Sequence, residues 1–369
     1  MKILITGGHF TPAKAVIEEL LKNKNIEIVY VGRKTSMEGD SALSAESLTL
    51  SKLKIKYKTF ITGRLRRSFD LLTIFSLLKI PIGMIQSIFI LLNERPDIIL
   101  SFGGYISVPL VITGWFLSIP IITHEQGLTL GLANKINSLF ANKIALSFPG
   151  NFTGRKIIIT GNPLREEILN AKKLEGDYKE IFNRSRKLKL PLILITGGNQ
   201  GSHAINLAIE GCLQNLLKIT CVIHQTGESK YNDFERLKIS KNERYLPVRW
   251  VDDEIGGLLS SVSLIVCRSG MNTLMESAFI GVPVLTIPIN KHFEQNQNAQ
   301  FFQKIGLANI LFQKKLSPKS LEEEIKQMLK NTQKLKQKAR KAKLQIIPDA
   351  SKRLALETVL LAKISNYEA

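Results

Sequence analysis

Cysteines, long apolar runs and targeting signals are scarce in this sequence. The chain of 369 residues has three cysteines, Cys212, Cys221 and Cys267, and their spacing fits neither a disulfide framework nor a zinc site. No stretch reaches the roughly 18 to 20 uninterrupted apolar residues of a membrane-spanning helix. Residues 1–30 do not resemble a signal or transit peptide. We therefore expect a protein of a reducing compartment that neither spans a membrane nor holds a metal ion.

Acidic residues are also few relative to basic ones. The 51 lysines and arginines outnumber the 31 aspartates and glutamates, which gives a net charge of +20. The basic residues gather in residues 47–69 and 330–343. Such charge can meet nucleic acid, an anionic membrane, a phosphorylated substrate or simply solvent. Because no nucleic-acid-binding motif occurs, we expect no nucleic-acid partner.

The sequence ILITGG occurs twice, at residues 3–8 and 193–198, and each copy is typical of a strand, a glycine turn and a helix start. Strand and helix patterns alternate along the chain, which predicts parallel sheets. The series restarts after a charged stretch at 171–189. We therefore expect an α/β fold with two Rossmann-like domains. Strands are predicted at residues 2–6, 26–31, 97–101, 119–123 and 143–147, and again at 192–196, 219–224, 245–249, 263–267, 282–287 and 308–312.

The domain boundaries follow from this restart. Residues 1–162 are predicted to form the first domain, 163–345 the second, and 346–369 a C-terminal helix that packs back on one of them. The buried face of that helix is predicted from apolar residues at helical spacing, namely Leu356, Val359, Leu360 and Ile364.

Residues 68–92 are the most apolar part of the chain, and two interpretations stay open. They could form a pair of buried helices. They could instead form an apolar patch that dips into an anionic membrane surface beside flanking cations. Those cations are Arg64, Arg66, Arg67 and Lys79.

Glycine turns that lead into helices favour anion binding, because the first amides of a helix are free to donate. Neither ILITGG copy is a full dinucleotide motif or a P-loop. In residues 264–288 a predicted strand ends at Cys267 and a loop turns into a helix, whose amides could hold a diphosphate without a metal ion. Glu276 in that helix could accept both hydroxyls of a ribose, or could be an ordinary surface glutamate. Gln295 follows the next strand, at the ligand edge of an open sheet.

A series of short motifs runs along the chain, namely TGGHFTPA, SFGGYISVP, THEQGLTLGLANK, FPG, GNPLR, GGNQGS, RWVDDE, CRSGMNTLMES, EQNQNA and IPDASKR. Taken in this order, they resemble the motifs of the MurG family of glycosyltransferases. The resemblance implies the GT-B fold, in which two Rossmann-like domains face a cleft. It also implies inverting transfer of N-acetylglucosamine (GlcNAc) from UDP-GlcNAc to the 4-hydroxyl of the muramyl sugar in lipid I, which gives lipid II for peptidoglycan. The expected partners are UDP-GlcNAc, lipid I and the anionic cytoplasmic face of the cell membrane, with no cofactor.

The resemblance also implies site residues. His9 is the first candidate for the general base, although it could merely position the substrate, and Glu125 is the second. Residues around UDP-GlcNAc are expected to be Thr6, Gly7, Gly8, Arg165, Asn199, Val251, Met271, Asn272, Thr273, Leu274, Met275, Glu276 and Gln295.

Two departures from the family pattern concern the first domain. Ile5 leads directly into Thr6, where the family has a further glycine pair, and Gly127 replaces an asparagine that contacts the donor. Three alternatives stay open: transfer to another lipid acceptor, a UDP-GlcNAc 2-epimerase, which shares the two-domain fold, and a non-catalytic protein that binds the UDP-sugar, which the two departures allow.

Overall fold

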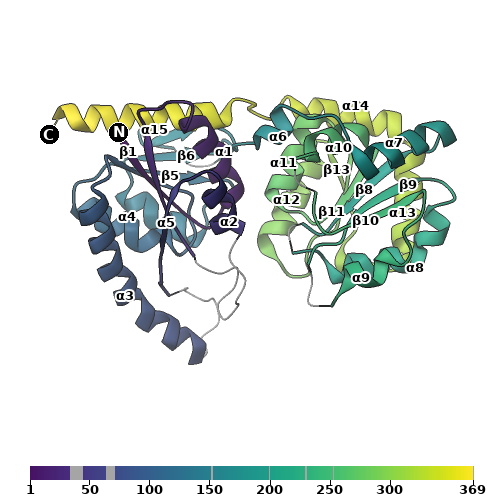
Figure 1. The fold of residues 1–369 in the computed structure, drawn as a ribbon, viewed down its shortest axis with the longest axis horizontal. Helices are drawn as coiled ribbons and strands as arrows, with labels where there is room; N and C mark the ends of the chain where they lie inside the picture. Colours follow the sequence, from purple (N-terminus) through teal and green to yellow (C-terminus); the bar gives the residue numbers. More distant parts are fainter. Residues whose placement is uncertain are drawn as a thin grey trace. The chain divides into compact units, whose positions relative to one another are not determined.

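A computed structural model of the chain describes residues 1–33, 45–63, 71–150, 153–198, 200–228, 231–251 and 253–368. It divides into two compact units, coloured along the sequence in Figure 1. The first unit comprises Met1–Arg165 together with Asp349–Ala369, and the second comprises Glu166–Pro348. The predicted boundary after residue 162 lies close to this division, and the C-terminal helix belongs to the first unit.

The first unit is built on a seven-stranded parallel sheet of order β3-β2-β1-β4-β5-β6-β7. Two of its strands were not predicted: β3 is half lysine, and β7 is only three residues long. The strands are β1 (Lys2–Thr6), β2 (Glu27–Gly32), β3 (Lys56–Thr59), β4 (Ile98–Ser101), β5 (Ile121–Glu125), β6 (Lys143–Leu146) and β7 (Ile157–Ile159).

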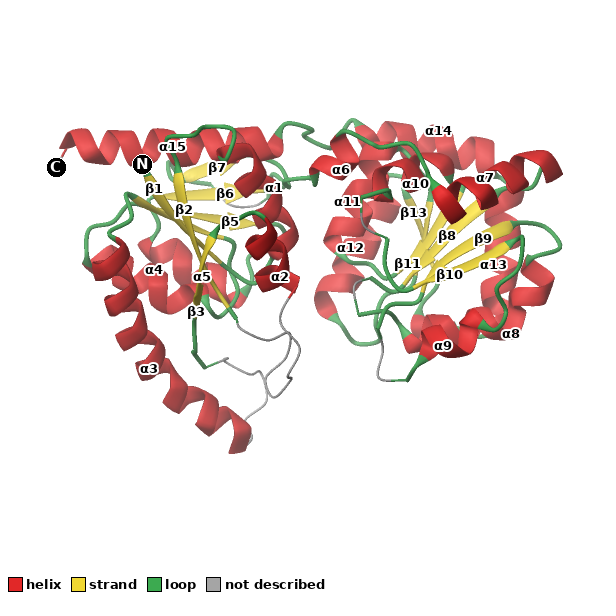
Figure 2. Ribbon diagram, viewed as in Figure 1, coloured by secondary structure: helices red, strands yellow, loops and turns green. Residues whose placement is uncertain are grey.

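Helices cover both faces of this sheet (Figure 2). Alternate residues of β1 face opposite sides: Ile3 and Ile5 pack with α1 and α15, whereas Leu4 packs in the core beneath α3 and α4. Burial on both faces explains why central strands such as β1 and β4 are nearly continuous apolar runs. The helices are α1 (Phe10–Leu20), α2 (Ala45–Lys52), α3 (Leu71–Glu94), α4 (Ser107–Phe116), α5 (Leu132–Phe140) and α15 (Ala350–Glu368).

The buried face of α15 differs from the predicted one. Leu356, Leu360 and Ile364 are exposed, while Leu354 and Ala362 are fully buried in the core of the first unit. Small residues on the buried face let α15 lie close to α1, so a pattern of large apolar residues was a poor guide here.

The second unit has a six-stranded parallel sheet of order β10-β9-β8-β11-β12-β13, and all six strands were predicted. They are β8 (Leu192–Thr196), β9 (Cys221–Gln225), β10 (Tyr245–Val248), β11 (Leu264–Cys267), β12 (Val284–Thr286) and β13 (Ala308–Ile310). The helical elements are α6 (Glu166–Leu169), α7 (Gly176–Leu188), α8 (His203–Leu216), α9 (Asp233–Lys238), α10 (Ile255–Ser261), α11 (Met271–Ile280), α12 (Phe293–Lys304), the short 3₁₀ helix η1 (Gln313–Lys315), α13 (Pro318–Lys330) and α14 (Thr332–Lys343).

The two ILITGG copies form corresponding strands. β1 lies between β2 and β4, and β8 lies between β9 and β11, so each is the strand at which the chain order of its sheet reverses. Ligands of open α/β sheets bind at such reversal points, outside the carboxyl ends of the strands. The repeated sequence therefore marks the ligand edge of each unit.

The apolar segment forms one helix, α3, rather than a buried helix pair, so that interpretation was wrong. Ile85 and Phe89 on α3 are 56% and 63% exposed, and Trp115 at the end of the neighbouring α4 is 50% exposed. None of the helices in the described ranges combines the length and hydropathy that a membrane crossing would need. Lys79 lies on α3, whereas Arg64, Arg66 and Arg67 lie outside the described residues.

Candidate active site

The glycine turn after β1 is packed against the loop that follows β4. Gly7 has a φ of +149°, and a Cβ at this position would lie 2.7 Å from Phe102 Cβ, so only glycine fits. Gly8 donates its backbone N–H to Gly103 O at 2.9 Å. The hydroxyl of Thr6 is buried and makes no hydrogen bond within the described part of the chain. The turn is therefore held rigidly at the ligand edge of the first unit.

His9 directly follows this turn and precedes the first residue of α1. It is half-buried, and its Nδ1 lies 2.8 Å from Nε2 of Gln126, the residue just after β5. The loops after β1 and β5 therefore meet at the imidazole of His9. Sequence reasoning did not connect Gln126 with His9, because 117 positions separate the two residues.

Glu125 is buried, and both of its carboxylate oxygens accept hydrogen bonds. Oε1 accepts from the Gly127 N–H at 2.8 Å, while Oε2 accepts from the Gly131 N–H and from Asn134 Nδ2, both at 2.9 Å. A base must offer a lone pair to the proton that it removes. Glu125 therefore holds the loop of residues 126–131 in place. Because both of its oxygens are engaged, it is a weaker candidate for the base than His9.

Gly127, the position that departs from the family pattern, lies in the loop that the Glu125 carboxylate holds by hydrogen bonds. A Cβ there would lie 3.0 Å from Glu125 Oε1 and 3.2 Å from Thr129 O, which is closer than nearly all ordinary contacts. An asparagine would need a shift of the loop. Glycine at this position therefore lets the loop backbone lie close to the Glu125 carboxylate.

His124 is buried next to this loop. Its Nε2 lies 3.2 Å from Gly161 O and 3.3 Å from Ser147 Oγ. Burial lowers the pKa of His124 to about 4, so the ring is neutral near pH 7. A fully buried neutral ring suits structural support rather than contact with a substrate.

The second glycine turn, after β8, packs against the loop after β9. A Cβ on Gly201 would lie 2.0 Å from Thr226 O, and one on Gly227 would lie 2.2 Å from Gly201 N. Ser202, at the N-terminus of α8, is buried, and its Oγ makes no hydrogen bond among the described residues. An unused hydroxyl beside free helix amides suits an anionic ligand. Asn199, in the same turn, lies outside the described residues.

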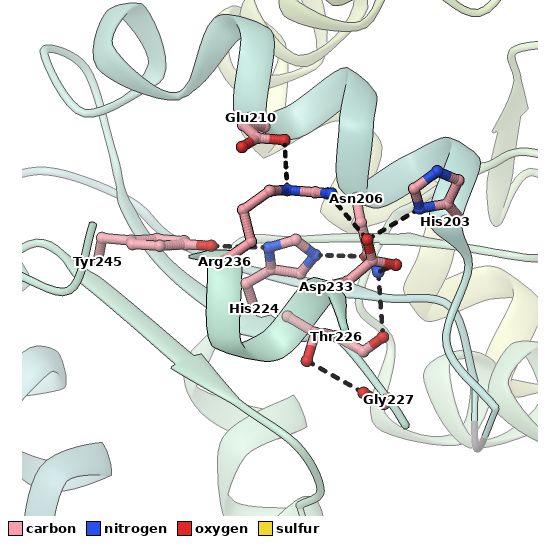
Figure 3. Close-up of polar contacts among 9 residues, drawn as sticks. All are labelled: His203, Asn206, Glu210, His224, Thr226, Gly227, Asp233, Arg236 and Tyr245. Atoms are coloured by element: carbon pink, nitrogen blue, oxygen red, sulfur yellow. Dashed lines mark hydrogen bonds and ion pairs between the residues drawn. The ribbon is translucent and has the colours of Figure 1, made fainter. Parts of the chain in front are cut away.

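A polar network joins the helix after this turn to α9 and to the loop after β9 (Figure 3). Asp233, the first residue of α9, accepts hydrogen bonds at 2.8 Å from three side chains: His203 and Asn206 of α8, and Arg236. Asn206 also donates to Thr226 O at 3.2 Å, and its Oδ1 lies 3.0 Å from His224 Nε2. Since Asn206 Nδ2 serves two acceptors, its Oδ1 accepts from His224 Nε2–H. The network therefore ties α8, α9 and the loop after β9 together.

His224 lies at the centre of this network. Its Nδ1 lies 2.9 Å from the hydroxyl of Tyr245, and burial lowers the pKa of His224 to about 3. The ring is therefore neutral. The sequence assigned no role to His224, and nothing in its spacing pointed to Asn206 or Asp233.

The predicted nucleotide helix, α11, begins at Met271 directly after β11 and the Arg268–Gly270 loop. Met271, Leu274 and Met275 are buried in the core of the second unit, so only their backbone amides remain for a ligand. Asn272 and Thr273 are half-buried, and Asn272 Oδ1 makes no hydrogen bond in the described ranges. Glu276 is 4% exposed, so it is not the ordinary surface glutamate that the sequence left open.

The remaining predicted positions are divided between the two units. Gln295, in the first turn of α12, accepts a hydrogen bond at Oε1 from the Ile289 N–H at 3.0 Å. Val251 is buried beyond the end of β10 in the same unit. Arg165 is half-buried, and it is the last residue of the first segment of the first unit, whereas the predicted boundary assigned it to the second domain. Each unit thus places its own predicted residues beyond the carboxyl ends of its strands.

Comparison with known proteins places this arrangement in a family. The model of the glycosyltransferase family 28 N-terminal domain matches residues 6–146, and that of the C-terminal domain matches residues 192–354. A relative from Clostridium kluyveri is 32% identical over 89% of this chain and 91% of its own length. One from Treponema denticola is 34% identical over 85% and 83%. Both carry the name UDP-N-acetylglucosamine–N-acetylmuramyl-(pentapeptide) pyrophosphoryl-undecaprenol N-acetylglucosamine transferase. The chain therefore belongs to the MurG group of glycosyltransferase family 28.

Solved structures confirm the GT-B fold. The crystal structure of Acinetobacter baumannii MurG matches with a TM-score of 0.73 and 24% identity, covering 97% of this chain and 99% of that one. The calicheamicin glycosyltransferase CalG4 matches with a TM-score of 0.70 at 12% identity, covering 98% of each chain. The Neisseria meningitidis UDP-GlcNAc 2-epimerase bound to UDP-GlcNAc matches with a TM-score of 0.63 at 17% identity, covering 98% of this chain and 100% of that one. The fold by itself therefore does not separate a transferase from an epimerase.

Proposed function

We propose that this chain transfers GlcNAc from UDP-GlcNAc to the muramyl sugar of lipid I and so forms lipid II. The observation that carries the proposal is the identity of 32% over 89% of the chain to a transferase named for this reaction. The match extends over both domains of the family. The alternative of a 2-epimerase is supported only by similarity of fold, since the Neisseria meningitidis epimerase is 17% identical to this chain.

The proposed chemistry is a single inverting displacement. The acceptor hydroxyl oxygen forms a bond to C1 of GlcNAc as the bond from C1 to the diphosphate breaks. His9 takes the hydroxyl proton, and UDP leaves with the bonding electron pair. His9 is favoured over Glu125 because both oxygens of Glu125 are engaged by the 126–131 loop.

The leaving diphosphate needs stabilisation of its growing negative charge. In the proposed mechanism the amides at the start of α8 and α11 supply it, together with Ser202 Oγ and without a metal ion. Glu276 accepts hydrogen bonds from the ribose hydroxyls, Val251 meets the uracil through its backbone, and Gln295 contacts the sugar. The unused buried hydroxyl of Ser202 supports this assignment.

Lipid I is a membrane-bound substrate, so the proposal includes reversible attachment of the first unit to the anionic cytoplasmic face of the membrane. Support comes from exposed apolar side chains that share a face of α3, including Ile82, Ile85, Phe89 and Leu92. Lys79 lies on the same helix. Shallow insertion of apolar side chains together with nearby cations is the usual means of peripheral attachment.

The test is incubation of the full chain with UDP-GlcNAc and a short-chain lipid I analogue in detergent, followed by mass spectrometry. A product heavier by one GlcNAc, with UDP released, supports the proposal. Free N-acetylmannosamine with UDP would indicate the epimerase, and UDP binding without turnover would indicate a non-catalytic protein. A diacylglycerol acceptor in a parallel reaction tests transfer to another lipid.

A further inference from the structure

The side chain of Gln126 reaches the imidazole of the proposed base. Its Nε2 lies 2.8 Å from His9 Nδ1, and its Oε1 makes no hydrogen bond within the described part of the chain. Gln126 is 6% exposed, so water has little access to its amide group. The state of the His9 ring therefore depends on which end of this amide faces it.

An amide and a neutral imidazole can meet in two ways. The amide N–H can donate to a bare Nδ1, and the ring proton is then on Nε2. Alternatively Oε1 accepts from Nδ1–H, and Nε2 is then bare. The two ends of an amide have almost the same shape, so hydrogen bonding rather than packing decides between them. Half a turn of the Gln126 amide places its unpartnered oxygen on Nδ1.

Only the second arrangement fits a base that acts through Nε2. Such a base has a bare nitrogen before the reaction and a proton on both nitrogens after it. With the amide nitrogen facing the ring, Nδ1–H of the imidazolium would point at amide hydrogens. With Oε1 facing the ring, the same oxygen accepts from Nδ1–H before and after proton transfer. The acceptor arrangement therefore serves both states of the reaction.

On the basis of the proposed function, we propose that Gln126 is a positioning residue that fixes the Nδ1–H tautomer of His9 and so makes Nε2 the proton-accepting nitrogen. The adjacent titratable groups do not serve this purpose. Both oxygens of Glu125 hold the 126–131 loop, and His124 Nε2 is engaged with Gly161 O and Ser147 Oγ. Within the described part of the chain, Gln126 makes the hydrogen bond to His9 Nδ1.

The tautomer can be read directly by nuclear magnetic resonance. The full chain contains five histidines, so a two-bond proton–nitrogen correlation spectrum of protein labelled with ¹⁵N-histidine is simple, and His9→Gln assigns the His9 signals. The proposal predicts a protonated Nδ1 and a bare Nε2 in the wild type above pH 7.5. Gln126→Leu should shift the ring to the Nε2–H form or to a mixture, and Gln126→Glu, which keeps an acceptor oxygen, should retain Nδ1–H. An Nε2–H ring in the wild type, or a tautomer that Gln126→Leu does not change, would overturn the proposal.

A kinetic cycle separates positioning from general support of the fold. Gln126→Leu should lower kcat by about tenfold or more while the UDP affinity, a property assigned to the second unit, stays unchanged. If Gln126 acts through His9, the double variant with His9→Gln should be no slower than His9→Gln alone, because the two losses share one cause. A double variant whose loss of kcat equals the product of the two single losses would contradict the proposal. Gln126→Glu should recover most of the activity that Gln126→Leu loses.

The spectroscopic experiment stays decisive if the proposed reaction fails. Absence of GlcNAc transfer by the wild type would refute the proposed function, whereas the His9 tautomer is read without any substrate. Far-ultraviolet circular dichroism and the thermal midpoint of each variant show whether Gln126→Leu is folded. If it is not, Gln126→Glu and the wild-type spectrum still decide the tautomer.

Discussion

Asn134 Nδ2 donates a hydrogen bond to Glu125 Oε2 at 2.9 Å, and through this contact α5 holds the end of β5. The same carboxylate accepts from two backbone amides of the loop between these elements. The arrangement makes Glu125 a structural anchor of the 126–131 loop.

Replacing Glu125 with glutamine tests that assignment. Glutamine has nearly the same size as glutamate, but its amide N–H would face one of the donors that Glu125 now accepts from. The variant also loses the negative charge that strengthens these hydrogen bonds. The free energy of unfolding should fall by roughly 1.5–3 kcal/mol. Glu357→Gln, which removes one part-exposed ion pair with Lys143, is the matched control and should cost about 1 kcal/mol or less. Denaturant titration measures both. An inactive Glu125→Gln variant of unchanged stability would point instead to Glu125 as the base.

Glu276→Ala tests the proposed nucleotide site. Loss of hydrogen bonds from a ribose diol to a buried carboxylate should weaken UDP binding by roughly 1.5–3 kcal/mol, measured by titration calorimetry. Glu243→Ala, in the same unit but exposed, is the control and should bind UDP like the wild type. Equal affinities of a folded Glu276→Ala variant and the control would remove Glu276 from the site.

The buried histidines predict a loss of stability in acid. Burial lowers the pKa of His224 from its ordinary 6.5 to about 3, so the unfolded chain binds a proton in this interval that the folded chain does not. The stability contributed by the neutral ring is complete well above pH 6.5 and falls as the pH decreases, with a slope that steepens toward about 1.4 kcal/mol per pH unit between the two pKa values. Unfolding of the second unit at pH 7, 6 and 5 should show this slope, and His224→Leu should flatten it. An unchanged slope in the variant would exclude His224 as its source.

Membrane attachment should depend on the exposed face of α3. Co-sedimentation with vesicles should rise with anionic lipid content and fall with salt, since charges are screened over about 10 Å at 0.1 M. The double change Ile85→Glu and Phe89→Glu should abolish it and leave UDP binding intact. Ile239→Glu, at an apolar residue that is 87% exposed in the second unit, is the control. If the wild-type chain does not co-sediment with anionic vesicles at low salt, the proposed membrane attachment is refuted.

Strand and glycine patterns predicted much of the fold from sequence alone. ILITGG marked the central strands because buried parallel strands are apolar on both faces and end in turns that need glycine. The lysine-rich β3 and the buried face of α15 were missed because edge strands and small-residue contacts carry no strong periodicity. Those features depend on tertiary packing.

The candidate site was predictable only as a set of positions. Motifs singled out His9 and the α11 loop as candidates, and in the structure each follows a strand of its sheet. The motifs could not show that Met271, Leu274 and Met275 are buried in the core. These residues belong both to the first turns of α11, where a ligand could bind, and to the face of α11 that packs against the core. Nor could the motifs show that Gln126 meets His9, because that contact joins loops distant in sequence.

The most direct test of the central claim is the anomeric configuration of the sugar transferred to a lipid I analogue, measured by proton coupling at C1 after reaction in excess EDTA. The account predicts a β-linked GlcNAc on the 4-hydroxyl of the muramyl sugar, one UDP released per transfer, and a rate unaffected by the chelator. His9→Gln should slow this product by about 10²-fold or more. An α-linked product, or transfer that ceases in EDTA and returns with Mg²⁺ or Mn²⁺, would contradict the account.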